Sequence, residues 1–126
     1  MRLLLDTHVL IWWTANHPML SDKAKTLIAN PANEVYFSSI SIWEIAIKHA
    51  KAQFSLGALE MKEQLIKDGF LSLAFSDLHA AEVAKLAAFH ADPFDRALIA
   101  QALYEPMHLV THDQVVAQYD QSIIQI

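Results

Sequence analysis

The chain has 126 residues, of which 54% are hydrophobic and 18% charged, with only two glycines, and this composition excludes a disordered or low-complexity chain. Its formal net charge of −5 is the wrong sign for a protein that coats nucleic acid by bulk electrostatics. The absence of cysteine excludes disulfides, thiolate metal sites and cysteine nucleophiles. We expect a single domain over residues 1–126 with a substantial core.

The apolar run at the start of the chain is too short for a targeting segment. Three leucines at positions 3–5 are followed at once by Asp6, which ends the run before it reaches the length of a signal-peptide core. No later run approaches the length of a membrane span. We therefore expect a cytoplasmic protein without a membrane segment.

Short apolar runs alternate with helical patterns along the first half of the chain. Turn residues separate them, notably the Asn-Pro-Ala-Asn stretch at 30–33. The predicted elements are a strand over Arg2–Leu5, a helix over Thr7–Ala15, a short helix from Ser21, a strand over Val35–Phe37 and a helix over Ser39–Lys48.

The second half continues the alternation, with Gly69 as a helix C-cap. Its predicted elements are a helix over Ala58–Lys67, a strand over Phe70–Phe75, a helix from Ser76 to Phe89, a helix from Pro93 to Ala102, a strand over Met107–Val110 and a strand over Ile123–Ile126. This order predicts an α/β three-layer sandwich: a central, mostly parallel five-stranded sheet with helices on both faces.

One predicted helix opens on two carboxylates. Asp92 suits the N-cap because its side chain can accept an unpaired backbone N–H, and Pro93 suits the first helical position because it has no N–H to lose. Asp95 follows in the first turn. It is either a capping-box acid that bonds back to the Asp92 backbone or a functional acid, depending on whether other acids converge on it.

Glu44 is the only charged residue between Glu34 and Lys48. A capping box with Ser41 as its cap is one interpretation, since the two residues form a Ser-x-x-Glu pattern. Apolar residues at helical spacing on both sides of Glu44 favour another, in which the helix starts at Ser38 or Ser39 and Glu44 points inward.

Two acids follow predicted strands. Asp6 comes after the first strand and Asp113 after the fourth, so both belong at the carboxyl edge of a parallel sheet, where functional groups collect. A cluster of these acids with Glu44 and Asp95 would repel itself unless protons or a divalent cation compensated. Oxygen ligands without cysteine favour Mg²⁺ or Mn²⁺ over structural zinc, and such ions activate water for phosphodiester cleavage.

Four stretches resemble motifs of the PIN-domain family, in particular its VapC-type toxins. They are LLLDTH at 3–8, SIWEIAIK at 41–48, DPFDRALIAQA at 92–102 and VTHD at 110–113. The resemblance implies a PIN-like sandwich and a Mg²⁺-dependent endoribonuclease, with Mn²⁺ as a substitute, that cleaves RNA by metal-activated water. It also implies a cognate antitoxin, a homodimer, and a catalytic and metal-binding set consisting of Asp6, Glu44, Asp95 and Asp113.

Some neighbouring residues have two interpretations. Asp113 can instead cap the segment that begins at Gln114, and Arg96 either contacts a carboxylate or phosphate or forms a surface ion pair with Asp92 or Asp95. The remaining candidates are Thr7 and Thr111 as hydroxyl donors behind the acids, and Trp12 and Trp13 as a partner surface.

Two rival functions remain at this point. An aspartate-nucleophile phosphatase would use Asp6, but its chemistry usually needs a second aspartate two residues on, where His8 stands, and it leaves Glu44 unexplained. A catalytically silent PIN-like binding module would keep the acids for a structural ion.

Overall fold

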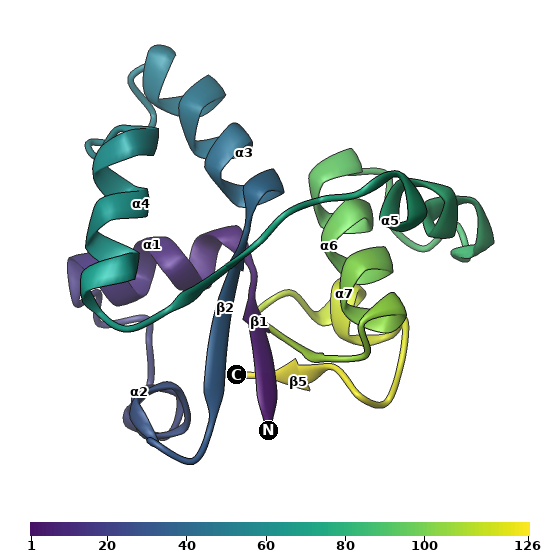
Figure 1. The fold of residues 1–126 in the computed structure, drawn as a ribbon, viewed down its shortest axis with the longest axis horizontal. Coiled ribbons are helices and arrows are strands. Elements are labelled where there is room, and N and C mark those ends of the chain that lie inside the picture. The colour runs from purple at the N-terminus through teal and green to yellow at the C-terminus, as the bar shows by residue number, and fades with distance from the viewer.

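The computed structural model describes residues 1–126 as a five-stranded sheet between two layers of helices (Figure 1). The strand order is β3-β2-β1-β4-β5, and every neighbouring pair is parallel. The strands are β1 (Arg2–Leu5), β2 (Glu34–Ser38), β3 (Leu71–Leu73), β4 (His108–Thr111) and β5 (Ile124–Gln125). The predicted three-layer α/β sandwich is confirmed.

Seven α-helices and one 3₁₀ turn connect these strands. They are α1 (Thr7–Ala15), α2 (Asp22–Ala29), α3 (Ser39–Ala50), α4 (Ala58–Lys67), α5 (Asp77–Glu82), η1 (Val83–Lys85), α6 (Pro93–Tyr104) and α7 (Gln114–Ala117). No helix has the length and apolar character that a membrane crossing requires.

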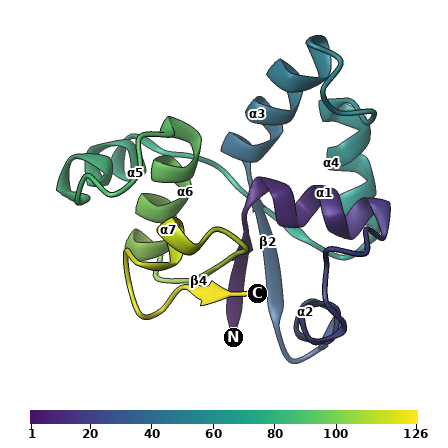
Figure 2. The ribbon, with the colours of Figure 1, turned by 180° about the vertical axis from the view of Figure 1, so that it is seen from behind.

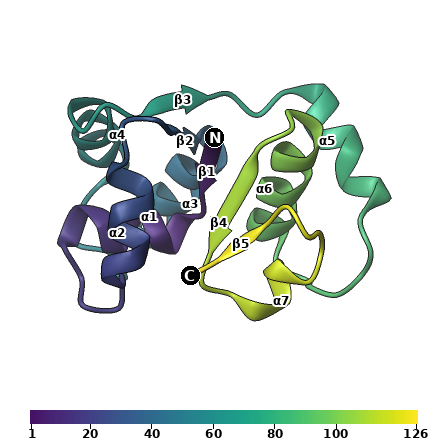
Figure 3. The same cartoon turned by 90° about the horizontal axis from the view of Figure 1, so that it is seen from below.

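Strand β1 supplies side chains to a core on each face of the sheet. Leu3 and Leu5 belong to the cluster formed with α1, α2, α3 and α4, whereas Leu4 belongs to the cluster formed with α6 and α7. These two groups of helices lie on opposite sides of β1 when the molecule is seen from behind or from below (Figures 2 and 3). All three leucines are fully buried, and each contributes about 1.5–3 kcal/mol to stability.

Two predicted boundaries are wrong. The third strand stops at Leu73 because side chains bind the next backbone groups: Gln101 Nε2 donates to the Ala74 carbonyl at 3.2 Å. The helix predicted to reach Phe89 ends after η1. There the Arg96 guanidinium donates to the carbonyls of Val83 and Ala87, which a continuing helix would use for its own hydrogen bonds.

The parallel arrangement brings several helix N-termini to one edge of the sheet. Helices α1, α3 and α7 begin within three residues of the ends of β1, β2 and β4, respectively. Their backbone N–H groups and helix dipoles favour negative charge at this edge. The fold therefore provides a suitable place for carboxylates.

Candidate active site

Asp6 is fixed at the junction of β1 and α1. Its Oδ1 caps α1 by accepting the Val9 backbone N–H at 2.9 Å, and its Oδ2 accepts the Thr111 hydroxyl from the end of β4. Burial raises the pKa of Asp6 despite these hydrogen bonds, and the charge of Glu44 adds to the rise. Thr111 thus lies behind the acid, as predicted.

Asp95 lies in the first turn of α6, whose N-cap is Asp92 as predicted. The Asp92 carboxylate accepts the backbone N–H groups of Phe94 and Asp95 at 2.8 and 3.1 Å. Asp95 does not form the alternative capping box; instead, its Oδ2 lies 2.8 Å from His90 Nε2. Burial, followed by the charges of Asp92 and Asp6, raises the pKa of Asp95 to about 7.

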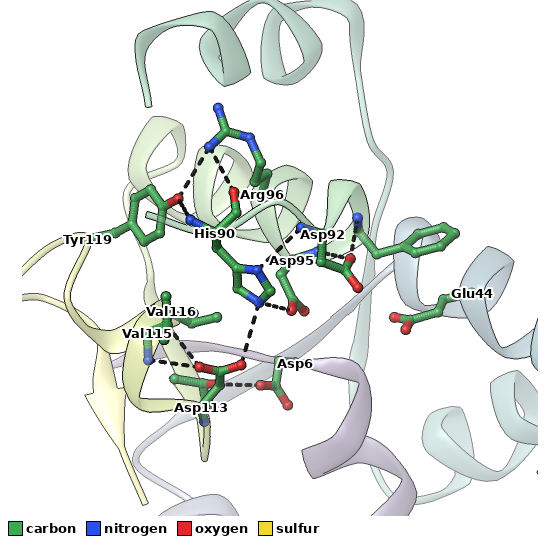
Figure 4. Close-up of polar contacts among 12 residues, drawn as sticks. Asp6, Glu44, His90, Asp92, Asp95, Arg96, Asp113, Val115, Val116 and Tyr119 are labelled. Atoms are coloured by element: carbon green, nitrogen blue, oxygen red, sulfur yellow. Dashed lines mark hydrogen bonds and ion pairs between the residues drawn. The ribbon is translucent and has the colours of Figure 1, made fainter. Parts of the chain in front are cut away.

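Glu44 lies inside α3 and is only 4% exposed. The helix is capped by Ser38, so the capping box at Ser41 is wrong; Ser41 instead accepts the Thr7 hydroxyl at 2.9 Å. Glu44 Oε2 pairs with Lys48 Nζ at 2.6 Å, whereas its buried Oε1 has no hydrogen-bond partner. Figure 4 shows the carboxylate pointing toward the region of Asp6 and Asp95.

Asp113 both caps a helix and faces the other acids, the two alternatives predicted for it. Its Oδ1 caps α7 by accepting the backbone N–H groups of Val115 and Val116 at 2.8 and 3.2 Å. Its Oδ2 faces the other acids and lies 3.5 Å from His90 Nε2 (Figure 4). Asp113 therefore caps a helix with one oxygen and leaves the other directed into the site.

A pocket of about 240 Å³ opens between these groups. Its lining residues are Asp6, His8, Trp12, Asp95, His112 and Asp113. Next to it, ligand atoms of His90, Asp95 and Asp113 all lie within 4.8 Å of one another. The structure thus brings Asp6, Asp95 and Asp113 together, with Glu44 facing them from α3.

The predicted contact of Arg96 with a carboxylate, including the ion pair with Asp92 or Asp95, is wrong. Its guanidinium pairs with neither Asp92 nor Asp95 but donates to the Ala87 and His90 carbonyls at 2.8 and 3.3 Å. It also donates to the Tyr119 hydroxyl at 3.2 Å. Arg96 therefore holds the loop between η1 and α6 through hydrogen bonds to protein oxygens.

The two adjacent tryptophans have separate surroundings. Trp12 lines the acidic pocket, whereas Trp13 packs on Phe70 with ring centroids 5.6 Å apart and donates from Nε1 to Asp68 at 3.0 Å. Only Trp12 therefore belongs to the site.

Three histidines near the acids were not among the predicted site residues. His112 adjoins Asp113 in sequence, His8 lies two residues after Asp6, and both belong to the family-like stretches VTHD and LLLDTH, so these signals could have selected them from seven histidines. His90 had no such signal, because its contact with Asp113 depends on the path of a loop.

Together, the fold and the site define a small α/β domain with an acidic centre at the carboxyl edge of a parallel sheet. The sequence model of the PIN domain family matches residues 3–121 of this chain. The chain belongs to the PIN-domain family.

Known proteins similar to this chain are consistent with that assignment. Ribonuclease VapC22 of Mycobacterium tuberculosis is 32% identical over 113 residues, which cover 88% of this chain and 86% of that protein. The crystal structure of VapBC2 from Rickettsia felis bound to a DNA fragment from their promoter matches with a TM-score of 0.70 at 18% identity, covering 100% of this chain and 98% of the matched chain. A toxin-antitoxin complex from Klebsiella pneumoniae matches with a TM-score of 0.65 at 18% identity, covering 98% and 99%.

Proposed function

We propose that this protein is a Mg²⁺-dependent endoribonuclease and the toxin of a toxin–antitoxin pair. Asp6, Glu44, Asp95 and Asp113 form its catalytic and metal-binding set. The observation that carries the proposal is the buried Glu44 Oε1, which has no hydrogen-bond partner and belongs to a carboxylate directed at other acids. A buried, unpaired carboxylate oxygen is costly, and a cation in the acidic site would offset that cost.

The donor set fits a hard divalent cation. Carboxylate oxygens at the junction of β1 and α1, in α3, in α6 and in the loop after β4 are the ligand type that Mg²⁺ and Mn²⁺ prefer. When bound, such an ion neutralises the acids, acts as a Lewis acid toward a phosphate and lowers the pKa of water. It would also let an acidic protein accept a polyanion.

The protein's own contribution is to hold the carboxylates in place. The Thr111 hydroxyl and the Val9 backbone N–H fix the two Asp6 oxygens, and Lys48 fixes one oxygen of Glu44. His90 does the same for Asp95. Because each acid is fixed by a neighbour, the site requires little rearrangement to receive a phosphodiester.

The relatives support the nature of the substrate and the partner. The similar protein of M. tuberculosis is named a ribonuclease, and the similar structure from K. pneumoniae is a toxin-antitoxin complex. By this analogy the present chain acts on RNA and is held inactive by a cognate antitoxin. A homodimer and a cytoplasmic location belong to the same proposal.

The position of Glu44 favours a nuclease over the aspartate-nucleophile phosphatase. The phosphatase hypothesis needs a second acid near Asp6 in sequence and gives Glu44 no role. In the structure, the Glu44 charge contributes to raising the pKa of both Asp6 and Asp95. Glu44 therefore acts electrostatically on the same centre.

The test is cleavage of a labelled, structured RNA pool by purified protein with Mg²⁺ or Mn²⁺ and with EDTA. Asp6→Asn and Asp95→Asn proteins are purified identically, together with Glu63→Gln, which removes an exposed charge on α4. We expect discrete cuts by the wild type and Glu63→Gln proteins, and none with EDTA or with either aspartate variant. Equal cleavage by all four proteins would indicate a contaminant. No cleavage by antitoxin-free protein that binds Mg²⁺ in calorimetry would favour the binding module.

A further inference from the structure

Helix α1 carries an aromatic wall along one side of the acidic pocket. His8 and Trp12 lie four residues apart on this helix, so both side chains lie on one face. Their ring centroids are 6.2 Å apart in an edge-to-face arrangement. Because Asp6 caps α1, the first turn of the helix places His8 beside the acids.

His112 adds a third ring to this wall from the end of strand β4. It follows β4 directly, and its ring lies 5.2 Å from that of Trp12 at an interplanar angle of 70°. Its Nδ1 lies 2.8 Å from the Ile126 carbonyl oxygen, a hydrogen bond that fixes the ring against the C-terminal segment. Rings from two chain segments far apart in sequence therefore meet edge to face at Trp12, whose indole is also stacked with His17 at a centroid distance of 6.0 Å.

The wall borders solvent as well as the core. His8 and His112 are exposed, Trp12 is partly buried, and all three line the same pocket as Asp6, Asp95 and Asp113. The pocket volume of about 240 Å³ is below the roughly 300 Å³ at which sites for drug-sized ligands begin. The pocket is therefore suited to a small part of a larger ligand.

We propose that His8, Trp12 and His112 form a subsite for one unpaired nucleobase next to the phosphate that the acids act on. The inference rests on the proposed function and adds a substrate class to it. An acidic centre recognises a phosphate through its cation but does not engage a base, whereas aromatic rings stack on any base. A base inside a duplex is already stacked and paired, so the subsite selects single-stranded loops or ends.

The neighbouring tryptophan provides a matched control. Trp12→Leu and Trp13→Leu each replace one indole on the same helix with an apolar side chain, but Trp13 contacts Phe70 and Asp68 outside the pocket. We expect Trp12→Leu to lower kcat/KM for a hairpin RNA with an unpaired loop by roughly 5- to 150-fold, the range expected for one stacked base. Trp13→Leu is expected to retain the wild-type value, and Trp12→Phe to recover part of the loss. Thermal melting establishes that each variant is folded.

A second substrate isolates the base itself. In the same hairpin, an abasic nucleotide is introduced at each position flanking the cut. We expect one abasic position to reduce wild-type cleavage as Trp12→Leu does, and to cause no further loss with that variant. The proposal is overturned if folded Trp12→Leu and wild type cleave the intact RNA equally. It is also overturned if Trp12→Leu and the abasic nucleotide lower cleavage independently, so that their fold losses multiply.

Binding separates failure of the subsite from failure of the nuclease. A Trp13→Phe, Trp43→Phe protein retains Trp12 as its only tryptophan, and its fluorescence is titrated with a short 2′-O-methyl oligonucleotide. If the oligonucleotide quenches the fluorescence but wild type cleaves no RNA, the base subsite is supported and the nuclease proposal is wrong. If neither quenching nor cleavage is seen, both proposals are wrong. If Trp12→Leu cleaves normally but no longer binds the co-expressed antitoxin, the wall belongs to the protein partner and the proposal is wrong.

Discussion

His90 Nε2 lies 2.8 Å from Asp95 Oδ2, so an imidazole is the direct neighbour of the acid in the first turn of α6. The other ring nitrogen, Nδ1, accepts the Asp92 backbone N–H at 3.3 Å, which leaves the ring hydrogen on Nε2 to be donated to Asp95. The His90 backbone N–H is itself held by the Tyr119 hydroxyl at 2.8 Å. These contacts suit His90 to position the Asp95 carboxylate.

Replacing His90 therefore tests the alignment of Asp95. We expect His90→Ala to lower kcat/KM for RNA roughly 10- to 100-fold and to raise the Mg²⁺ concentration needed for half-maximal rate. His90→Gln retains an N–H donor and should recover part of both effects. The measurement is a Mg²⁺ titration of the cleavage rate.

His108→Gln is the control for this prediction, because His108 begins β4 at the opposite edge of the sheet and bonds to the Ser122 carbonyl. It should leave the Mg²⁺ dependence unchanged. If His90→Ala has the same Mg²⁺ dependence as the wild type, His90 does not position Asp95.

The acids could be predicted from the sequence because element junctions determine where they lie. Asp6 and Asp113 each follow a strand and cap the next helix, and these local relationships are visible in the order of residues. Glu44 was identifiable because a single charge inside a strongly apolar helix must either cap it or point into a polar site. Parallel pairing of the strands then brings these junctions to one edge.

The rest of the site depends on contacts that local patterns do not encode. Helical periodicity indicates that Trp12 and Trp13 point in different directions, but not which one faces the acids. The position of His90 depends on a loop held by Arg96 and Tyr119, which is fixed only when α6 packs. Arg96 lacks the predicted ion pair for the same reason: an arginine beside two aspartates favours one, but four protein oxygens accept hydrogen bonds from its guanidinium instead.

Burial of Asp95, together with repulsion from the neighbouring acids, predicts a pH-dependent gain in stability for Asp95→Asn. Because folding raises the pKa of Asp95 from 3.8 to about 7, the folded state binds more protons than the unfolded chain between these values, and stability falls as pH rises through that window. Without metal at pH 8, we expect Asp95→Asn to raise Tm by roughly 5 °C. The gain should vanish below about pH 3, under both pKa values, where the wild-type carboxyl is protonated in both states.

Asp120→Asn should behave in the opposite way. Its hydrogen bonds to Ser122 lower the pKa of Asp120, so its stabilising effect is present at neutral pH and is lost as pH falls below the ordinary aspartate range.

Asp6→Asn and Glu44→Gln should also raise Tm in metal-free buffer by relieving repulsion. If all three site variants lower Tm without metal, the acids do not repel one another as the structure implies.

Lys48 is the only hydrogen-bonded partner of the Glu44 carboxylate. Lys48→Met retains an apolar side chain but leaves Glu44 charged and unpaired beside the other acids, which we expect to cost about 1–2 kcal/mol in metal-free buffer. This is less than for a fully buried pair, because the Lys48 side chain is 29% exposed. Urea unfolding with and without Mg²⁺ measures the effect.

Mg²⁺ should restore more stability to Lys48→Met than to the wild type, because the ion takes over the role of the lysine. The double variant Glu44→Gln, Lys48→Met should recover the loss without metal. An equal loss in the single and double variants would mean that Lys48 acts through its packing on Phe54, 5.7 Å from its Nζ, rather than through Glu44.

Arg96→Ala distinguishes a loop anchor from a phosphate contact. The Arg96 guanidinium donates to the Ala87 and His90 carbonyls, so we expect its loss to leave the salt dependence of RNA binding unchanged and to speed proteolysis of the loop over residues 86–92. A lost phosphate contact would instead lower the slope of log Kd against log salt by roughly 0.7–0.9. Both measurements are made on an Asp6→Asn background, in which the RNA stays intact. A smaller slope with unchanged proteolysis would show that Arg96 contacts phosphate and does not anchor the His90 loop.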